Sequence, residues 1–134
     1  MQTVFTISTQ GHGLYEMTDH AAAWVQSTGF LTLFVRHTSA SLLIQENADP
    51  EVRKDLRAFF ARLVPQATDP AMSYRTHTYE GPDDMLAHIK SALLPVSINI
   101  PVTAGRLALG IWQGIYLFEH RDAPKQREVV AHLQ

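Results

Sequence analysis

A long strand-like segment, LALGIWQGIYLFEH at residues 107–120, constrains the fold more than any other part of the chain. Successive side chains of a strand point to opposite faces, and here both faces are largely apolar. A strand with two apolar faces is covered on both sides. Gly110 and Gly114 would share one face, which indicates close approach of another backbone or of a second subunit. The segment therefore predicts one continuous strand packed between other elements.

Further strands and a short helix are predicted from alternation and from turn residues. The segments with strand character are residues 3–9, 30–37, 41–46, 97–102 and 127–133. Residues 18–28 are typical of a short helix, with Thr18 as its N-cap and Gly29 just beyond its end. Strands outnumber helices, so we expect an α+β fold with a mainly antiparallel sheet system.

The clearest predicted helix covers residues 49–64. Asp49 can cap it, and Pro50 fits its first turn. Its apolar side chains recur at helical spacing on one stripe: Val52, Leu56, Phe59, Phe60 and Leu63. We expect this stripe to pack on the core, within a single domain of residues 1–134.

The charge balance and the missing cysteines exclude several classes of protein. The chain has 11 Lys and Arg against 13 Asp and Glu, a formal net charge of −2, whereas nucleic-acid binders show a basic excess. With no cysteine, a metal would have to bind His, Asp or Glu. No run approaches the ~20 apolar residues of a membrane span, and the N-terminus lacks the features of a signal peptide. We therefore expect a cytoplasmic protein that binds neither membranes nor nucleic acids.

A third predicted helix, which begins near Pro82, carries a candidate catalytic pair. Asp84 and His88 are four residues apart and so lie on one helix face. Asp84 could accept a hydrogen bond from the His88 ring and fix its tautomer. The alternative is that Asp83 and Asp84 only cap the helix and that His88 is half-exposed.

Other histidines stand at the ends of predicted strands. His37 continues an apolar strand face and precedes Ser39 and Ser41, which are either turn residues or donors to a phosphate. A buried histidine bonded to a carbonyl is the alternative interpretation of His37. His120 ends the long strand. No two histidines have the spacing of the HExxH motif, so a metal site from His77, His88 and His120 would have to be assembled by the fold. The remaining histidines are expected at the surface: His12, His20 and His132.

Three segments closely resemble signature blocks of one known family. These segments are HTSASLLIQENADPEVRKDL, YEGPDDMLAHIKSALL and GRLALGIWQGIYLFEHR, which occur in this order from residue 37 to residue 121. They resemble the YjbQ family, which is described as a secondary thiamine-phosphate synthase enzyme family. The resemblance implies a mixed, mainly antiparallel β-sandwich with flanking helices, assembled as a homotrimer.

The resemblance also implies site residues, position by position. The implied catalytic residues are His37, Asp84 and His88. The implied phosphate- or substrate-binding residues are Ser39, Ser41, Glu46, Asn47, Lys90, Gln113, Glu119 and Arg121. Asp84, His88 and Lys90 are expected in one shared polar pocket. The chain departs from the family pattern at Thr78, Leu86 and Pro95.

The implied function is an enzyme that acts on a phosphorylated small molecule. The implied reaction joins an aminopyrimidine pyrophosphate to a thiazole phosphate with loss of pyrophosphate, and the family description marks it as secondary to another, primary activity. That chemistry needs cations or a divalent metal, Zn or Mg, to neutralise the leaving group. The alternative is a non-catalytic trimer that binds a phosphometabolite or a metal with the same residues.

Overall fold

The computed structural model describes residues 1–134, which form eight strands, three α-helices and one short 3-10 helix. The strands are β1 Gln2–Thr9, β2 Gly13–Glu16, β3 Gly29–Val35, β4 Ala40–Glu46, β5 Ser97–Thr103, β6 Arg106–Leu107, β7 Gln113–Glu119 and β8 Lys125–Leu133. The helices are α1 Thr18–Trp24, α2 Pro50–Leu63 and α3 Asp84–Leu93, and the 3-10 helix is Pro70–Met72.

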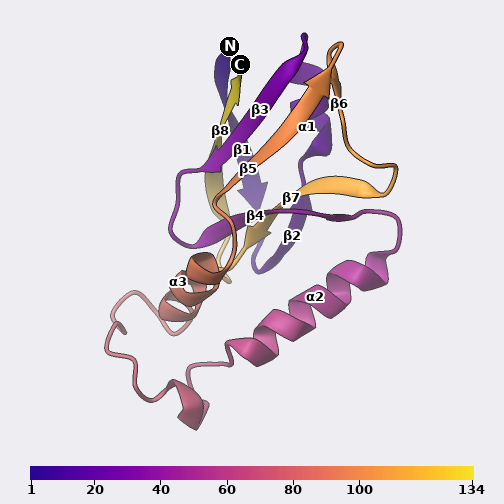
Figure 1. Cartoon of the computed structure of the whole chain (residues 1–134). Coiled ribbons are helices and arrows are strands. Elements are labelled where there is room, and N and C mark those ends of the chain that lie inside the picture. The colour runs from indigo at the N-terminus through magenta and orange to yellow at the C-terminus, as the bar shows by residue number, and fades with distance from the viewer.

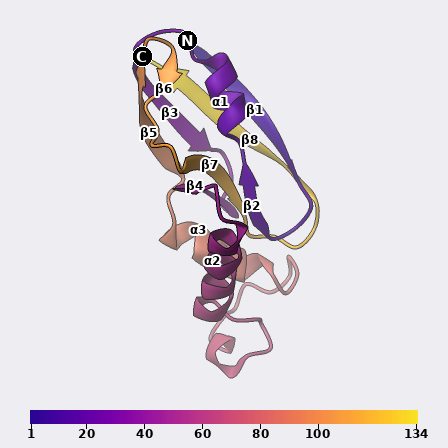
Figure 2. The same ribbon diagram turned by 90° about the vertical axis from the view of Figure 1, so that its right-hand side faces the viewer.

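The strands form two sheets in which every pairing is antiparallel. One sheet has the order β1-β8-β3-β5-β6, and the other has the order β2-β7-β4. Helices α2 and α3 lie together beyond one end of the sheets, and both chain termini lie at the opposite end (Figure 1). Viewed from the side, α1 lies beside β1 and β8, far from the other two helices (Figure 2).

The core lies between the two sheets. Leu31, Leu33 and Val35 of β3 are buried, whereas the alternate residue Phe34 points outward and is exposed. Buried residues of both sheets belong to one cluster of 16 side chains, which includes Leu117 of β7. The predicted α+β architecture, an antiparallel sandwich with helices beside it, is confirmed. None of the helices has the length and apolar character that a membrane span requires.

Helix α2 begins as predicted but does not pack as predicted. The Asp49 carboxylate accepts a hydrogen bond from the Glu51 amide at 3.0 Å, and Pro50 is the first helical residue. No residue of α2 is buried, and Phe59 and Leu63 are 57% and 53% exposed. The predicted stripe packs only in part: Phe60 meets the buried Phe118 ring with centroids 5.7 Å apart, whereas Phe59 and Leu63 remain exposed. Helical periodicity shows that a face is apolar but not how far it is covered.

The prediction of one continuous strand over residues 107–120 is also wrong. The chain leaves the five-stranded sheet after Leu107 and enters the three-stranded sheet at Gln113. In between, the Gly110 amide donates to the Gln113 side-chain oxygen at 2.8 Å, so Gly110 belongs to a turn and shares no strand face with Gly114. A Cβ atom on Gly114 would lie 2.7 Å from the Glu16 carboxylate, which can move aside, and 3.0 Å from the Cβ atom of Asn47, which is fixed more closely.

Two helix starts differ from the predictions in detail. Met17, not Thr18, is the N-cap of α1, and the Thr18 hydroxyl instead donates to the Glu16 carboxylate at 2.8 Å. Helix α3 begins at Asp84, and the Asp83 side chain makes no capping hydrogen bond. The Asp83 carboxylate instead accepts from the Asp122 amide at 2.8 Å, which ties the start of α3 to the chain after β7.

Candidate functional site

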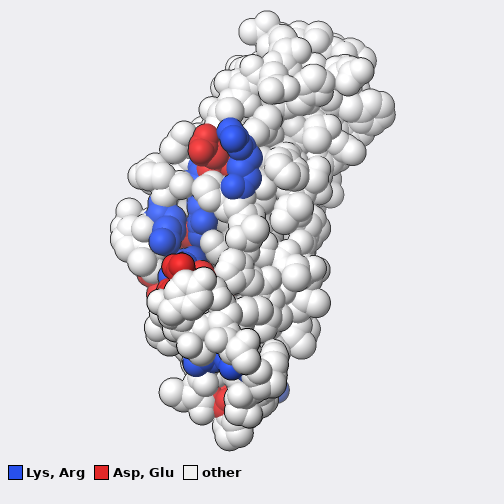
Figure 3. Space-filling view, turned by 90° about the vertical axis from the view of Figure 1, so that its left-hand side faces the viewer, with Lys and Arg blue, Asp and Glu red and all other residues white.

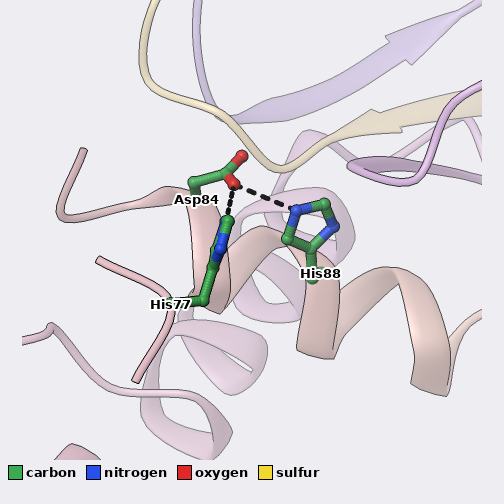
Figure 4. A group of neighbouring side chains, drawn as sticks. All are labelled: His77, Asp84 and His88. Atoms are coloured by element: carbon green, nitrogen blue, oxygen red, sulfur yellow. Dashed lines mark hydrogen bonds and ion pairs between the residues drawn. The ribbon is translucent and has the colours of Figure 1, made fainter. Parts of the chain in front are cut away.

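Three side chains converge at the start of α3. Asp84 and His88 project from the helix, and His77 reaches the same point from the loop before it (Figure 4). The Asp84 Oδ2 atom lies 2.7 Å from His77 Nε2 and 3.0 Å from His88 Nε2. One ligand atom from each residue lies within 4.8 Å of the others. We refer to His77, Asp84 and His88 as the histidine–aspartate cluster.

The surroundings of His88 fix the orientation of its ring. Its Nδ1 lies 2.9 Å from the Thr38 carbonyl, which can only accept, so Nδ1 carries a proton. In a neutral ring, the Nε2 lone pair then faces the Asp84 carboxylate, and the two electron-rich atoms repel each other. A second ring proton, or a cation bound between the two atoms, would remove this repulsion. A backbone carbonyl behind a histidine is also the usual arrangement that holds a metal-binding ring in place.

Arg121 holds the other side of the Asp84 carboxylate. Its Nη1 donates to Asp84 Oδ1 at 2.6 Å, and its Nε donates to Asp83 Oδ2 at 3.0 Å. Burial acts to raise the pKa of Asp84, but hydrogen bonds from His77 and His88 and the charge of Arg121 together hold it below its ordinary value. The Asp84 carboxylate is therefore ionised and rigidly placed.

A pocket of about 830 Å³ opens on the other side of His88. It lies between the turn that joins β3 to β4, the middle of α3 and the start of β8, and Arg36, His37 and Ser39 contribute to its wall with Arg127. No carboxylate lines it. On the face of the molecule that carries this turn and α3, charged side chains gather in one band beside an uncharged surface (Figure 3). We call the 830 Å³ pocket beside His88 the basic pocket, because Arg36 and Arg127 are its charged lining residues.

Arg127 is held by a buried carboxylate at the floor of this region. Its Nε donates to Glu119 at 2.7 Å and its Nη2 donates to the Ser39 hydroxyl at 2.8 Å. Glu119 has no exposed surface and Arg127 is 4% exposed. Burial acts to raise the pKa of Glu119, and hydrogen bonds from Arg127 and Thr9 more than offset it, so this pKa lies below its ordinary value of 4.5.

His37 lies in the wall of the basic pocket, as a partly exposed residue beyond the end of β3. Its Nε2 accepts a hydrogen bond from the Glu128 amide at 2.8 Å, so the ring proton is on Nδ1. Partial burial and the charge of Arg127 lower the pKa of His37, which favours the neutral ring. The Nδ1–H group is left as a donor.

The structure divides the predicted metal ligands between two places. His77 and His88 meet at Asp84, but His120 is not part of this cluster. His120 is 2% exposed, and its Nε2 lies 2.9 Å from the Ser41 hydroxyl, on the side of the sandwich near His12. The structure thus combines Asp84, rather than His120, with the two other histidines.

Lys90 is also separated from the pair with which it was expected to share a pocket. It is 6% exposed, and its ammonium nitrogen lies 3.3 Å from His12 Nε2. His88 lines the basic pocket, whereas Lys90 lines a different cavity. Residues two positions apart on a helix point about 200° apart, which accounts for the separation.

A third group of predicted residues lies at the far end of β4 and β7. The register pairs Glu46 with Gln113, and it pairs Ala40, beside the basic pocket, with Glu119. Six residues of strand separate the two ends, or about 20 Å. The Asn47 side-chain amide donates to the Glu16 carboxylate at 3.2 Å at this far end. Within one chain, these residues do not join the histidine–aspartate cluster.

Sequence reasoning missed two residues of the site region, Arg127 and His12. Arg127 lies in a segment for which the sequence predicts only a strand, although an arginine in an inward-facing strand position indicates a buried ion pair. His12 was expected at the surface, but it is half-buried between Phe118, His120 and Lys90. Its position between two glycines gave no signal of these contacts.

The three departures from the family pattern lie outside the cluster. Leu86 is buried against Val64 and Met72. The Pro95 carbonyl accepts a hydrogen bond from the Leu42 amide at 2.8 Å, so the backbone after α3 is tied to β4. Thr78 is exposed beside His77.

The fold and the site define a class of protein: a small antiparallel α+β sandwich with a histidine–aspartate cluster at the edge of a basic pocket. Residues 3–134 match the family model described as UPF0047 protein YjbQ-like, and the chain belongs to this family. It is 53% identical to UPF0047 protein sll1880 of Synechocystis, over 98% of this chain and 90% of that protein. It is 44% identical to UPF0047 protein YjbQ of Salmonella typhimurium, over 99% and 96% of the two chains.

Solved structures with the same fold support this assignment. The conserved hypothetical protein TT1486 from Thermus thermophilus superimposes with a TM-score of 0.85 at 35% identity, covering 98% of this chain and 99% of that one. A YjbQ/UPF0047 family protein from Clostridium acetobutylicum gives a TM-score of 0.85 at 30% identity, with the same coverage.

Proposed function

We propose that the protein is an enzyme that acts on a phosphorylated small molecule bound in the basic pocket, beside a divalent metal ion held by the histidine–aspartate cluster. The observation that carries this proposal is the position of His88. Its ring lines the pocket, and its Nε2 atom meets Asp84 Oδ2 together with His77 Nε2. A cation at this point would therefore lie next to bound substrate.

The ligand atoms favour zinc over magnesium. Two imidazole nitrogens and one carboxylate suit zinc and similar transition metals, whereas magnesium prefers oxygen ligands and retains several waters. Such a set of three protein ligands leaves a coordination position open, which is typical of catalytic rather than structural sites. A bound metal ion would supply positive charge to phosphate oxygens of the substrate.

The reaction implied by the family resemblance is formation of thiamine phosphate. A carbon–nitrogen bond forms between the methylene carbon of the aminopyrimidine and the thiazole nitrogen, while the carbon–oxygen bond to pyrophosphate breaks. The thiazole nitrogen carries no proton, so this step requires no base, and the negative charge departs with pyrophosphate. The main task of the chain is thus to hold and neutralise phosphate oxygens, and His88 serves this task as a ligand.

The walls of the basic pocket contain suitable donors. Arg127 Nη1 has no hydrogen-bond partner within the chain, because Glu119 and Ser39 engage the other two guanidinium nitrogens. His37 offers its Nδ1–H group, since its Nε2 is already bonded to the Glu128 amide. In this proposal both groups bind phosphate. Asp84 holds the metal ion with the two histidines, and Arg121 positions the Asp84 carboxylate.

The proposed experiment measures thiamine phosphate made by chelator-treated protein, with and without added Zn²⁺ or Mg²⁺. We expect Zn²⁺ to restore more product than Mg²⁺, and His88→Ala to lower product formation about 100-fold or more. The matched control is His20→Ala, which changes an exposed histidine of α1 and should retain full activity. Equal activity in His88→Ala and the wild type would refute the role of the cluster. Tight binding of the substrates without turnover would identify the protein as a binding module.

We further propose that the protein is a cytoplasmic homotrimer. The exposed apolar face of α2 and the exposed side chains of Ile111 and Trp112, at 84% and 59%, support self-association. We expect light scattering after size-exclusion chromatography to give three times the monomer mass of 15.0 kDa. Phe59→Lys on α2 should shift this mass toward the monomer, whereas a monomeric wild type would contradict the proposal.

A further inference from the structure

A second, smaller cavity of about 60 Å³ lies on the opposite side of α3 from the basic pocket. Buried or half-buried His12 of the β1–β2 turn, Lys90 of α3 and His120 after β7 form part of its polar wall. The other polar residues of the wall are Gln66, Asp83 and Asp122. Val64 and Leu86 supply apolar wall. None of these residues belongs to the histidine–aspartate cluster, so the cavity is a separate feature of the fold.

Lys90 places a positive charge in this cavity without a paired carboxylate. It is 6% exposed, and it forms no ion pair within 4.0 Å with any carboxylate. Its only hydrogen-bond partner is His12 Nε2, although an ammonium group has three donors. A buried ammonium group is costly unless its charge and its donors are matched. Lys90 is thus a cation whose remaining donors lack partners in the chain.

His120 also has a buried ring nitrogen without a hydrogen-bond partner. It is 2% exposed, and its Nδ1 is a buried atom without any hydrogen bond. In the tautomer in which the Ser41 hydroxyl donates to His120 Nε2, the ring proton lies on the unpartnered Nδ1, and the anion site requires this tautomer. Burial, followed by the charge of Lys90, lowers the pKa of His120 to about 3 and that of His12 to about 4. Both rings are therefore neutral at neutral pH and act through hydrogen bonds.

Neither carboxylate at the cavity wall, Asp83 or Asp122, forms an ion pair with Lys90. Burial lowers the pKa of Lys90, and the charges of Asp122 and Asp83 offset this only in part. Asp83 is engaged by Arg121 Nε at 3.0 Å and by the Asp122 amide at 2.8 Å. Asp122 is exposed to solvent, where its charge is screened. Among the buried groups of the wall, Lys90 has donors without partners, and His120 adds one in the tautomer with its proton on Nδ1. The matching ligand is therefore a compact acceptor with negative charge. A volume of about 60 Å³ has room for only a few water-sized groups.

We propose that Lys90, His12 and His120 form a binding site for a small oxyanion, distinct from the basic pocket. The Lys90 ammonium provides the charge, and the His120 Nδ1–H group provides a directed hydrogen bond. Inorganic phosphate and a small carboxylate such as acetate share this chemistry, and they serve as the two probes. The proposal does not depend on thiamine-phosphate synthesis or on a metal ion.

The test follows the imidazole signals of ¹⁵N-labelled protein by NMR while phosphate, or acetate, is added at constant pH and ionic strength. We expect saturable shifts of the His12 and His120 signals with at least one of the two anions, and the anion that acts tells a phosphate site from a carboxylate site. Signals would be assigned with His12→Gln and His120→Gln. Saturable shifts confined to His37 and His88 would place the anion in the basic pocket and overturn the proposal, as would no saturable shift with either anion.

A matched pair of lysine variants provides a second measurement. Lys90→Met removes the buried ammonium, and Lys54→Met makes the same change at an α2 side chain that is 76% exposed. At an anion concentration ten times the dissociation constant, binding raises the ratio of folded to unfolded protein about tenfold. We expect the full stabilisation in the wild type and in Lys54→Met, and a clearly smaller one in Lys90→Met, where only the basic pocket can still bind the anion. Equal stabilisation of both lysine variants by the anion would overturn the proposal. If Lys90→Met does not fold, the NMR titration of the wild type alone tests the site.

Discussion

Replacing Arg127 with methionine is expected to lower the free energy of unfolding by about 3–5 kcal/mol. The variant leaves the Glu119 carboxylate in an interior with no exposed surface and without its cationic partner. Methionine fills much of the same space, so the loss reports the uncompensated charge rather than an empty volume. Urea unfolding at pH 7, followed by circular dichroism, measures the difference.

An exposed ion pair on the neighbouring surface provides the control. Arg36 and Glu128 are 3.7 Å apart with side chains about half exposed, so Arg36→Met should cost less than about 1 kcal/mol. The double variant Arg127→Met, Glu119→Gln should regain part of the stability, because no buried charge remains. Equal stability of Arg127→Met and Arg36→Met would show that the buried pair contributes nothing special.

The stability from this pair also has a defined dependence on pH. The pKa of Glu119 in the folded protein lies below its ordinary value of 4.5. The contribution is therefore complete above about pH 4.5 and is lost as the pH falls through the native pKa. In Arg127→Met this part of the acid dependence should disappear.

Asp84→Asn is expected to weaken zinc binding about 100-fold or more, because the shared oxygen atom between His77 and His88 loses its charge. Competition with a chromophoric chelator measures the affinity. The matched control is Asp122→Asn, which changes an exposed carboxylate at the chain segment after β7 and should keep the wild-type affinity. If the wild type does not bind zinc, or if Asp84→Asn binds it equally well, the cluster is a hydrogen-bonded support for α3 rather than a metal site.

The parts of the site that lie within one helix were predictable, and those that meet across the chain were not. The spacing of Asp84 and His88 predicts their contact, which the structure shows at 3.0 Å. His77 joins them from an irregular loop and Arg121 joins from beyond β7, where no periodicity indicates a neighbour. The same limit explains Lys90: its place on the helix wheel separates it from His88, but the contact with His12 depends on the packing of a distant turn.

Local patterns were informative about strands and caps but not about where the chain changes sheets. Alternation in residues 30–35 gave the correct inward face of β3, because a half-buried strand has a period of two residues. In residues 107–120 the alternation continues through the turn at Gly110, so nothing in the pattern marks the exit from one sheet and the entry into the other.

The two ends of the chain are neighbours in the five-stranded sheet, far from both cavities. The Met1 amino group donates to the Leu133 carbonyl at 3.1 Å, and Gln2 pairs with His132. A short peptide linker could therefore join the old ends, and new ends could be opened in the irregular segment that follows α2. Such circular permutants would keep the sheet order, and they offer a direct way to ask which connections the fold requires.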